Sequence, residues 1–192
     1  MPQTVVLFHS ALGLRPAIHK FAELLRSQGH TVHTPDLFDG EVFSNLDDGI
    51  RKRDSLGIPV LIQRALASVE QLPTDVVYAG FSLGAASAQF LAGSRVGARG
   101  AILMHAALSL GMIGVDNWPA VPVQIHYAAG DPWMDSAVVE SFAKAARVSG
   151  QSCDVFEYEG NAHLFDDDGS ADYAPHSSAS MRQRVLEFLA KL

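Results

Sequence analysis

The chain has 192 residues, of which 48% are hydrophobic and 18% are charged, and its formal net charge at pH 7 is -7. This length and composition are typical of an ordinary globular protein, and we expect a single domain over residues 1–192. Basic residues form no run beyond residues 51–53, and the overall charge is acidic, which argues against nucleic-acid binding.

Targeting and redox features of the sequence predict a cytoplasmic protein. The N-terminus enters a strand-like run at Thr4, without the charged region and apolar stretch of a signal peptide. No apolar segment reaches membrane-spanning length, so we expect no membrane partner. Cys153 is the only cysteine, which excludes an intramolecular disulfide and suits a reducing compartment. The oligomeric state is left open.

Short β-branched apolar runs alternate along the chain with stretches of helical periodicity. Strands are predicted over residues 4–9, 31–33, 76–81, 100–105, 121–128 and 153–158. Helices are predicted over residues 16–27, 58–69, 83–93, 136–148 and 177–192, and a polar loop over residues 38–55. Because parallel strands need crossover helices, we expect about six mostly parallel strands in a compact three-layer α/β sandwich with no large cap domain.

A Gly-x-Ser-x-Gly motif at residues 80–84 lies between the third strand and the next helix, which is the pattern of a nucleophile elbow. The turn needs small residues because it holds Ser82 in strained geometry, and side chains at Gly80 or Gly84 would crowd the neighbouring strand and helix. The pentapeptide alone also occurs in ordinary strand-to-helix turns, so its context decides. We predict that Ser82 is the nucleophile of a serine hydrolase.

A serine nucleophile needs a base and an acid that orients the base. In an open α/β sheet, functional groups gather beyond the carboxyl ends of the strands. Asp131 follows the fifth predicted strand through a Gly-Asp-Pro turn, and His163 follows the last strand. The chain order Ser, Asp, His is that of α/β-hydrolases. We therefore predict that His163 is the base and Asp131 the acid that serve Ser82.

Other residues remain as alternatives for these roles. Asp135 and Asp166 are alternative acids, and His176 is the alternative base. A metal site at His30 and His33, near Asp36, is disfavoured because no third ligand has convincing spacing. The sequence predicts no metal and no cofactor.

Two backbone amides are expected to stabilise the oxyanion, one directly after the nucleophile and one in the loop after the first strand. We predict the amides of Leu83 and Ala11, with Ser10 or Leu12 as alternatives to Ala11. Hydrophobic residues in loops after strands are the candidates for the substrate pocket. They are Phe38, Leu108, Met112, Ile113, Trp118, Trp133 and Leu164.

Several blocks of the sequence, in the same order, resemble the dienelactone hydrolase family of α/β-hydrolases over nearly the whole chain. These blocks are the first strand and its loop through Gly13, residues 34–38, residues 80–84, residues 130–131 and residues 162–163. The resemblance implies the α/β-hydrolase fold, a triad of Ser82, Asp131 and His163, and oxyanion donors at Leu83 and Ala11.

Two departures from the family pattern concern the substrate. The founding members carry Cys as nucleophile and Glu in the oxyanion loop, whereas this chain has Ser82 and Ser10 and is a serine-nucleophile variant. Those enzymes also bind a substrate carboxylate with arginines, one of them shortly after the catalytic His. Here residues 166–168 after His163 are all Asp, and three acids would repel an anionic lactone.

The sequence thus predicts a hydrolase that cleaves a small carboxylic ester or lactone through an acyl-enzyme on Ser82. One alternative is a dienelactone hydrolase that uses Arg51 or Arg53 to bind the carboxylate of an anionic lactone. An alternative of another class is a catalytically silent α/β-hydrolase fold that serves as a binding module.

Overall fold

The computed structural model describes residues 1–192 and contains one sheet of six parallel strands in the order β2-β1-β3-β4-β5-β6. The strands are β1 (Thr4–Phe8), β2 (Thr31–His33), β3 (Val77–Phe81), β4 (Gly100–Met104), β5 (Val123–Ala128) and β6 (Cys153–Tyr158). The helices are α1 (Pro16–Ser27), α2 (Leu46–Leu56), α3 (Ile58–Ser68), α4 (Leu83–Ser94), α5 (Ser136–Val148) and α6 (Pro175–Lys191). The predicted parallel three-layer architecture is confirmed, and every strand pair is parallel.

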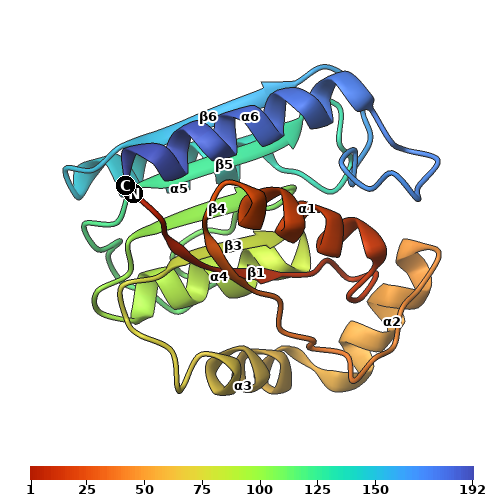
Figure 1. The fold of residues 1–192 in the computed structure, drawn as a ribbon, viewed down its shortest axis with the longest axis horizontal. Helices are drawn as coiled ribbons and strands as arrows, with labels where there is room; N and C mark the ends of the chain where they lie inside the picture. The colour runs from red at the N-terminus through yellow and green to blue at the C-terminus, as the bar shows by residue number, and fades with distance from the viewer.

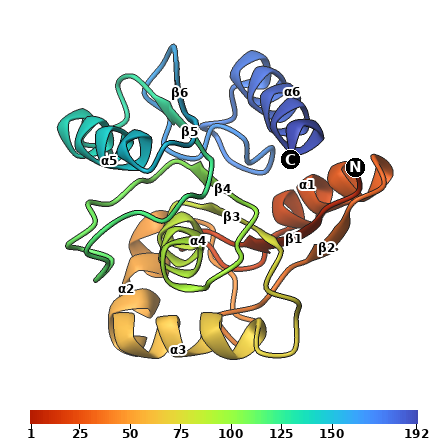
Figure 2. The ribbon, with the colours of Figure 1, turned by 90° about the vertical axis from the view of Figure 1, so that its left-hand side faces the viewer.

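Helices cover both faces of this sheet, as Figures 1 and 2 show. Helices α1 and α6 lie on one face, and α3, α4 and α5 lie on the other. Since both faces are covered, central strands can be apolar throughout, and every residue of β3 and β4 is buried. The predicted nucleophile turn therefore follows a strand that is held rigidly in the middle of the sheet.

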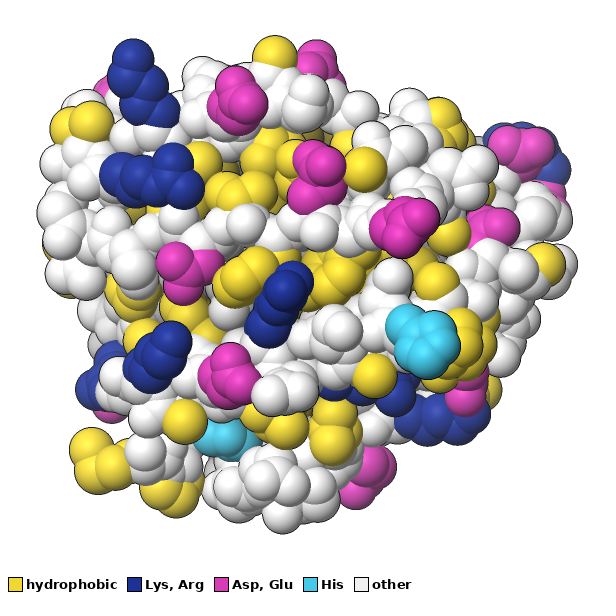
Figure 3. Space-filling model, turned by 90° about the horizontal axis from the view of Figure 1, so that it is seen from above, with side chains coloured by type: hydrophobic (Ala, Val, Ile, Leu, Met, Phe, Trp, Pro, Cys, Tyr) yellow, Lys and Arg dark blue, Asp and Glu magenta, His cyan; other side chains and the backbone are white.

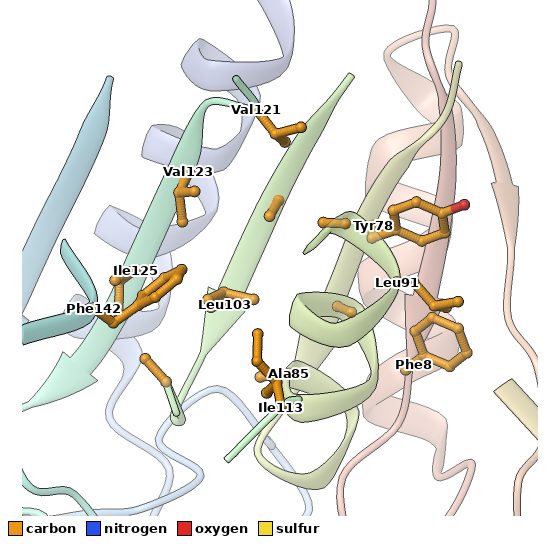
Figure 4. Packing of buried hydrophobic residues seen from close by; sticks show 14 of the residues in the cluster. Phe8, Tyr78, Ala85, Leu91, Leu103, Ile113, Val121, Val123, Ile125 and Phe142 are labelled. Carbon is orange, nitrogen blue, oxygen red and sulfur yellow. The ribbon is translucent and has the colours of Figure 1, made fainter. Parts of the chain in front are cut away.

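Two hydrophobic clusters hold the layers together. One contains 27 buried residues between the sheet and α3–α5, and Figure 4 shows Tyr78, Leu103 and Phe142 within it. The other contains 19 buried residues between the sheet and α1 and α6, including Phe21 and Val185. Such burial of aromatic and branched side chains supplies most of the driving force for folding.

Helix α2 lies where the sequence predicts a polar loop, so that prediction is wrong. The side chain of Asn45 caps the helix by accepting a hydrogen bond from the backbone N–H of Asp48 at 3.0 Å. Asp47 and Asp48 lie in the first turn, where negative charge is favourable. Most side chains of this helix are polar and only Gly49 is buried, so the apolar periodicity by which helices are usually predicted is weak.

Charges of both signs are mixed on the molecular face shown in Figure 3, where Lys and Arg side chains lie among Asp and Glu. This face therefore offers no large area of one sign that would attract a polyanion. None of the helices combines the length and the hydropathy that a transmembrane span requires.

Candidate active site

The turn between β3 and α4 consists of Ser82 alone, because β3 ends one residue before it and α4 begins one residue after it. Ser82 has φ 52° and ψ -111°, a strained conformation for a residue with a side chain. A Cβ atom on Gly80 would lie within 3.0 Å of the Gly84 carbonyl, and one on Gly84 within 3.0 Å of the Phe8 carbonyl. The predicted need for small residues at both glycines is confirmed.

A chain of hydrogen bonds connects three of the predicted site residues. The Oγ atom of Ser82 lies 2.8 Å from Nε2 of His163, and Nδ1 of His163 lies 2.7 Å from Oδ2 of Asp131. Asp131 and His163 are 5% and 6% exposed, and the other carboxylate oxygen of Asp131 accepts the backbone N–H of Trp133 at 2.9 Å. A carboxylate at Nδ1 favours the tautomer whose Nε2 can accept a proton from the serine hydroxyl.

The loops that carry Asp131 and His163 run side by side because they follow neighbouring strands. Strands β5 and β6 pair in parallel up to Ala128 and Tyr158. Beyond the strands, the N–H of Gly130 donates to the carbonyl of Gly160 at 2.8 Å. Asp131 and His163, which are 32 residues apart in the sequence, are thus brought into direct contact.

The alternative acids and base are engaged elsewhere. Asp135 caps α5 by accepting the N–H of Ala137 at 2.9 Å, and Asp166 pairs with Arg182 at 2.9 Å. His176 is exposed in the first turn of α6.

At the disfavoured metal site, His30 Nδ1 accepts the backbone N–H of Gln3 at 3.0 Å. No group of three or more His, Cys, Asp and Glu side chains is arranged to hold a metal ion.

The two residues predicted to supply the oxyanion amides, Leu83 and Ala11, both line the same cavity as Ser82. The amide of Leu83 lies in the first turn of α4, where no carbonyl one turn earlier is available to it. The amide of Ala11 donates to no protein acceptor. The amide of Leu12 is already used, since it donates to Oγ of Ser10 at 3.1 Å. Of Ser10, Ala11 and Leu12, only Ala11 lines the Ser82 cavity.

Ser82 and His163 open into a cavity of about 640 Å³ with 19 lining residues, 13 of them hydrophobic. Its walls come from α2, α3, α4 and the segment 106–114. The larger apolar side chains are Leu46, Ile50, Ile58, Ile62, Leu83, Phe90, Leu108, Met112, Ile113 and Trp133. The only other ionisable lining residues are Arg53 and His105. This volume and lining are typical of a small-molecule site.

The contribution of α2 and α3 to this cavity was not predicted. Leu46 and Ile50, and likewise Ile58 and Ile62, are apolar pairs spaced four residues apart, which places each pair on one side of its helix. That spacing was the available signal, but in α2 it lies within an otherwise polar stretch.

Three of the predicted pocket residues lie outside this cavity, contrary to expectation. Phe38 is fully buried and packs edge-on against His9, with ring centroids 5.1 Å apart. Trp118 packs edge-on against Phe142 at 4.9 Å in the core. Leu164 faces a separate small cavity. Phe38 and Trp118 thus belong to the packed core instead of facing the site.

The acidic run after His163 also lies away from the Ser82 cavity, since none of its members lines it. Each carboxylate has a cationic partner, and the pairs are Asp166 with Arg182, Asp167 with Arg15 and Asp168 with Lys20. Burial raises the pKa of Asp166 to about 6, against the opposing effect of Arg182. Because these charges are paired and line no part of the Ser82 cavity, the predicted repulsion of an anionic substrate has no support in the structure.

The parallel sheet, with a strained serine turn at the carboxyl end of a central strand, defines an α/β hydrolase. The sequence model of the dienelactone hydrolase family matches residues 2–192, and the chain belongs to this family. Its class of function is therefore that of a hydrolase acting on a small molecule. A search of curated protein sequences gave no match.

Solved structures of hydrolases share the fold. A dienelactone hydrolase-like promiscuous phosphotriesterase from metagenomic libraries has a TM-score of 0.78 and 21% identity, covering 100% of this chain and 87% of its own. Esterase 2 of Thermogutta terrifontis with propionate bound has a TM-score of 0.68 and 16% identity, covering 99% of this chain and 83% of its own. The same esterase phosphonylated by sarin has a TM-score of 0.68 and 19% identity, with coverages of 99% and 84%.

Proposed function

We propose that this protein is a serine hydrolase that cleaves small neutral carboxylic esters or lactones through an acyl-enzyme on Ser82. The observation that carries the proposal is the hydrogen-bonded chain from Ser82 through His163 to Asp131. Oγ of Ser82 attacks the carbonyl carbon while Nε2 of His163 takes the hydroxyl proton. His163 then gives this proton to the leaving alcohol, and a water molecule deacylates the enzyme with His163 again as base.

The roles of the remaining groups follow from their positions. Asp131 holds His163 in the reactive tautomer and stabilises the imidazolium. The amides of Ala11 and Leu83 bind the oxyanion of the tetrahedral intermediate, and one such donor is typically worth about 100- to 1,000-fold in kcat. The apolar lining of the cavity supports a neutral substrate whose acyl or alcohol part is hydrophobic.

Labelling with a fluorophosphonate tests this proposal, because an activated serine attacks phosphorus as it attacks carbonyl carbon. Thermogutta terrifontis esterase 2 is phosphonylated by sarin, which shows that a related fold supports this reaction. We expect one adduct by intact mass, at Ser82 by peptide mapping, and none on Ser82→Ala. An adduct elsewhere, or no adduct on the folded protein, would reject the nucleophile and favour a catalytically silent binding module.

A second candidate, hydrolysis of an anionic lactone, is favoured by one observation. Arg53 lines the Ser82 cavity, whereas Arg51 bonds to Asp48 and is largely exposed. Arg53 is also paired with Asp54 at 2.7 Å, so a substrate carboxylate would compete with a bound acid. Of the two arginines, only Arg53 lines the cavity, which supports Arg53 over Arg51 for this second candidate.

The matched variants Arg53→Gln and Arg51→Gln separate the two candidates in kcat/KM measurements. If the neutral-ester proposal is right, a short neutral ester outperforms an anionic dienelactone in the parent protein, and Arg53→Gln changes this ester's kcat/KM little. If the anionic lactone is the better substrate and only Arg53→Gln lowers its turnover, the second candidate replaces the first.

A further inference from the structure

His105, the residue after β4, is fully buried, yet neither of its ring nitrogens has a hydrogen-bond partner among the protein atoms. Its ring packs against Phe81 and Phe165, with centroids 5.8 and 4.5 Å away. Burial, with smaller effects of His163 and His126, lowers the pKa of His105 well below its usual value. The neutral ring therefore presents one N–H donor and one nitrogen acceptor that lack partners, a rare situation for buried polar groups.

A small, partly open cavity next to His105 has room for one water molecule. Its volume is about 20 Å³, and one water needs about 10–15 Å³ when volume is measured in this way. The polar residues around it are His105, Ser10, Arg15, Asp166 and Asp167. A bound water also needs two to four polar partners. Both the size and the lining of this cavity meet the requirements for a water site.

Two of these polar residues keep unused bonding capacity. The hydroxyl oxygen of Ser10 accepts the N–H of Leu12, but its own proton is bonded to no protein acceptor. Oδ1 of Asp166 accepts from both Ser178 and Arg182, which leaves Oδ2 without a partner. Ser10 and Asp166 are 4% and 3% exposed, and both line this cavity, so a water in it lies within reach of both side chains. Together with His105, they supply a water with both donors and acceptors.

The cavity lies between the two loops that flank Ser82. Ser10 precedes Ala11 in the loop after β1, and Asp166 lies three residues after His163. The rings of His105 and His163 are 6.1 Å apart. Arg15 already joins the two loops by donating to the carbonyl of Gly169 at 3.1 Å and pairing with Asp167. A water in the cavity would add a second, inner connection between the same loops.

We propose that this cavity binds one ordered water molecule through His105, Ser10 and Asp166, and that His105 acts through this water as a positioning residue for His163 and the Ala11 loop. His105 itself does not take part in bond making. Its effect on rate is exerted through geometry, since misplacement of reacting groups by about 1 Å can cost about 100-fold. The effect on rate rests on the proposed hydrolase function, whereas the water site does not.

The variant His105→Phe provides the main test because it keeps the aromatic packing and removes both ring nitrogens. If the parent protein holds the water, His105→Phe weakens its binding, and Ser10 and Asp166 lose the water as a hydrogen-bond partner. We therefore expect Tm to fall by about 2–6 °C. We also expect kcat for a short ester to fall by about 10-fold or more, with KM changed less than about twofold. Without a water, the substitution removes two unpaired polar atoms, so Tm would stay constant or rise and kcat would not change.

His105→Gln and a crystal structure of the parent protein complete the experiment. Gln retains a donor and an acceptor, so we expect it to restore part of the kcat lost in His105→Phe, which a purely structural role of the aromatic ring would not produce. The crystal structure should show one ordered water within hydrogen-bond distance of His105 and Asp166. A cavity without ordered density, or a His105→Phe variant with higher Tm and unchanged kcat, would overturn the proposal.

These measurements keep the proposal separate from the proposed function. If Ser82 reacts with no ester and no phosphonate, the hydrolase proposal fails and the positioning role fails with it. The crystal density and Tm then still decide whether the water site exists. If His105→Phe does not fold, the parent crystal structure and the kcat of His105→Gln relative to the parent decide.

Discussion

Gly49 of helix α2 packs directly on the carbonyl oxygen of Ala11, at a distance that leaves no room for a side chain. A Cβ atom at Gly49 would lie within 3.0 Å of that oxygen, and Gly49 is the only buried residue of α2. Through this contact, α2 packs against the loop that contains Ala11. It therefore also places Leu46, Ile50 and Arg53 on the wall of the Ser82 cavity.

Gly49→Ala should force α2 and the Ala11 loop apart. We expect kcat/KM for an ester to fall by about 10-fold or more and the free energy of unfolding to fall by about 1–3 kcal/mol. Gly111→Ala is the matched control, because Gly111 also lines the cavity but its Cβ would meet nothing within 4 Å. Equal kinetics for the two variants would show that the close approach is unimportant for the site.

Removal of Ser82, His163 or Asp131 tests their proposed roles. Ser82→Ala, His163→Ala and Asp131→Asn should each lower kcat by about 1,000-fold or more, and combined variants should lose far less than the product because the groups act as a unit. His176→Ala, which changes an exposed histidine, should retain the parent rate. Full activity of His163→Ala would instead transfer the role of base to another group.

The two tryptophans should separate stability from substrate binding. Trp118 is 5% exposed and packs on Phe142, so Trp118→Ala should cost about 3–5 kcal/mol of unfolding free energy. Trp133 is 53% exposed, lines the cavity and lies 5.8 Å from the ring of His163. Trp133→Ala should change stability little and raise KM. Denaturant unfolding and ester kinetics on both variants check this. A loss of stability in Trp133→Ala with a raised KM in Trp118→Ala would contradict the assignment.

Stability should fall on acidification because several histidines are buried as neutral rings. The pKa of His126 is lowered to about 3 by burial, with a smaller effect of Arg184. The ordinary pKa of a histidine side chain is 6.5, so between about pH 6.5 and about pH 3 the unfolded chain binds a proton that the folded chain does not. The contribution of neutral His126 to the free energy of unfolding is thus complete above about pH 6.5 and decreases as the pH falls toward about 3.

Replacement of this histidine should make the pH dependence less steep. Denaturant unfolding of His126→Gln at about pH 7 and about pH 5 should give a smaller difference than in the parent protein. Part of the dependence should remain, since burial also lowers the pKa values of His9 and His105. His19→Gln alters an exposed ring and serves as the control. An unchanged slope for His126→Gln would contradict the assignment.

Local sequence signals determined most of the framework. Apolar runs of strand length predicted all six strands, with bounds that differ from the observed ones by at most two residues. The spacing of Gly80, Ser82 and Gly84 predicted the nucleophile turn, because close approach of backbones there tolerates no Cβ atom. Asp131 and His163 were selected because each follows a strand end. These features could be predicted because they depend on backbone conformation over a few residues.

Tertiary structure alone decided the lining of the cavity and the surroundings of the charges. The sequence placed Trp118 and Trp133 in the same class, but packing put one in the core and the other beside His163. It likewise predicted that the acids at residues 166–168 repel an anionic lactone, whereas each is paired with a cation on α6, on α1 or just before α1. The physical reason is that burial and charge pairing depend on neighbours distant in the chain, which no local pattern specifies.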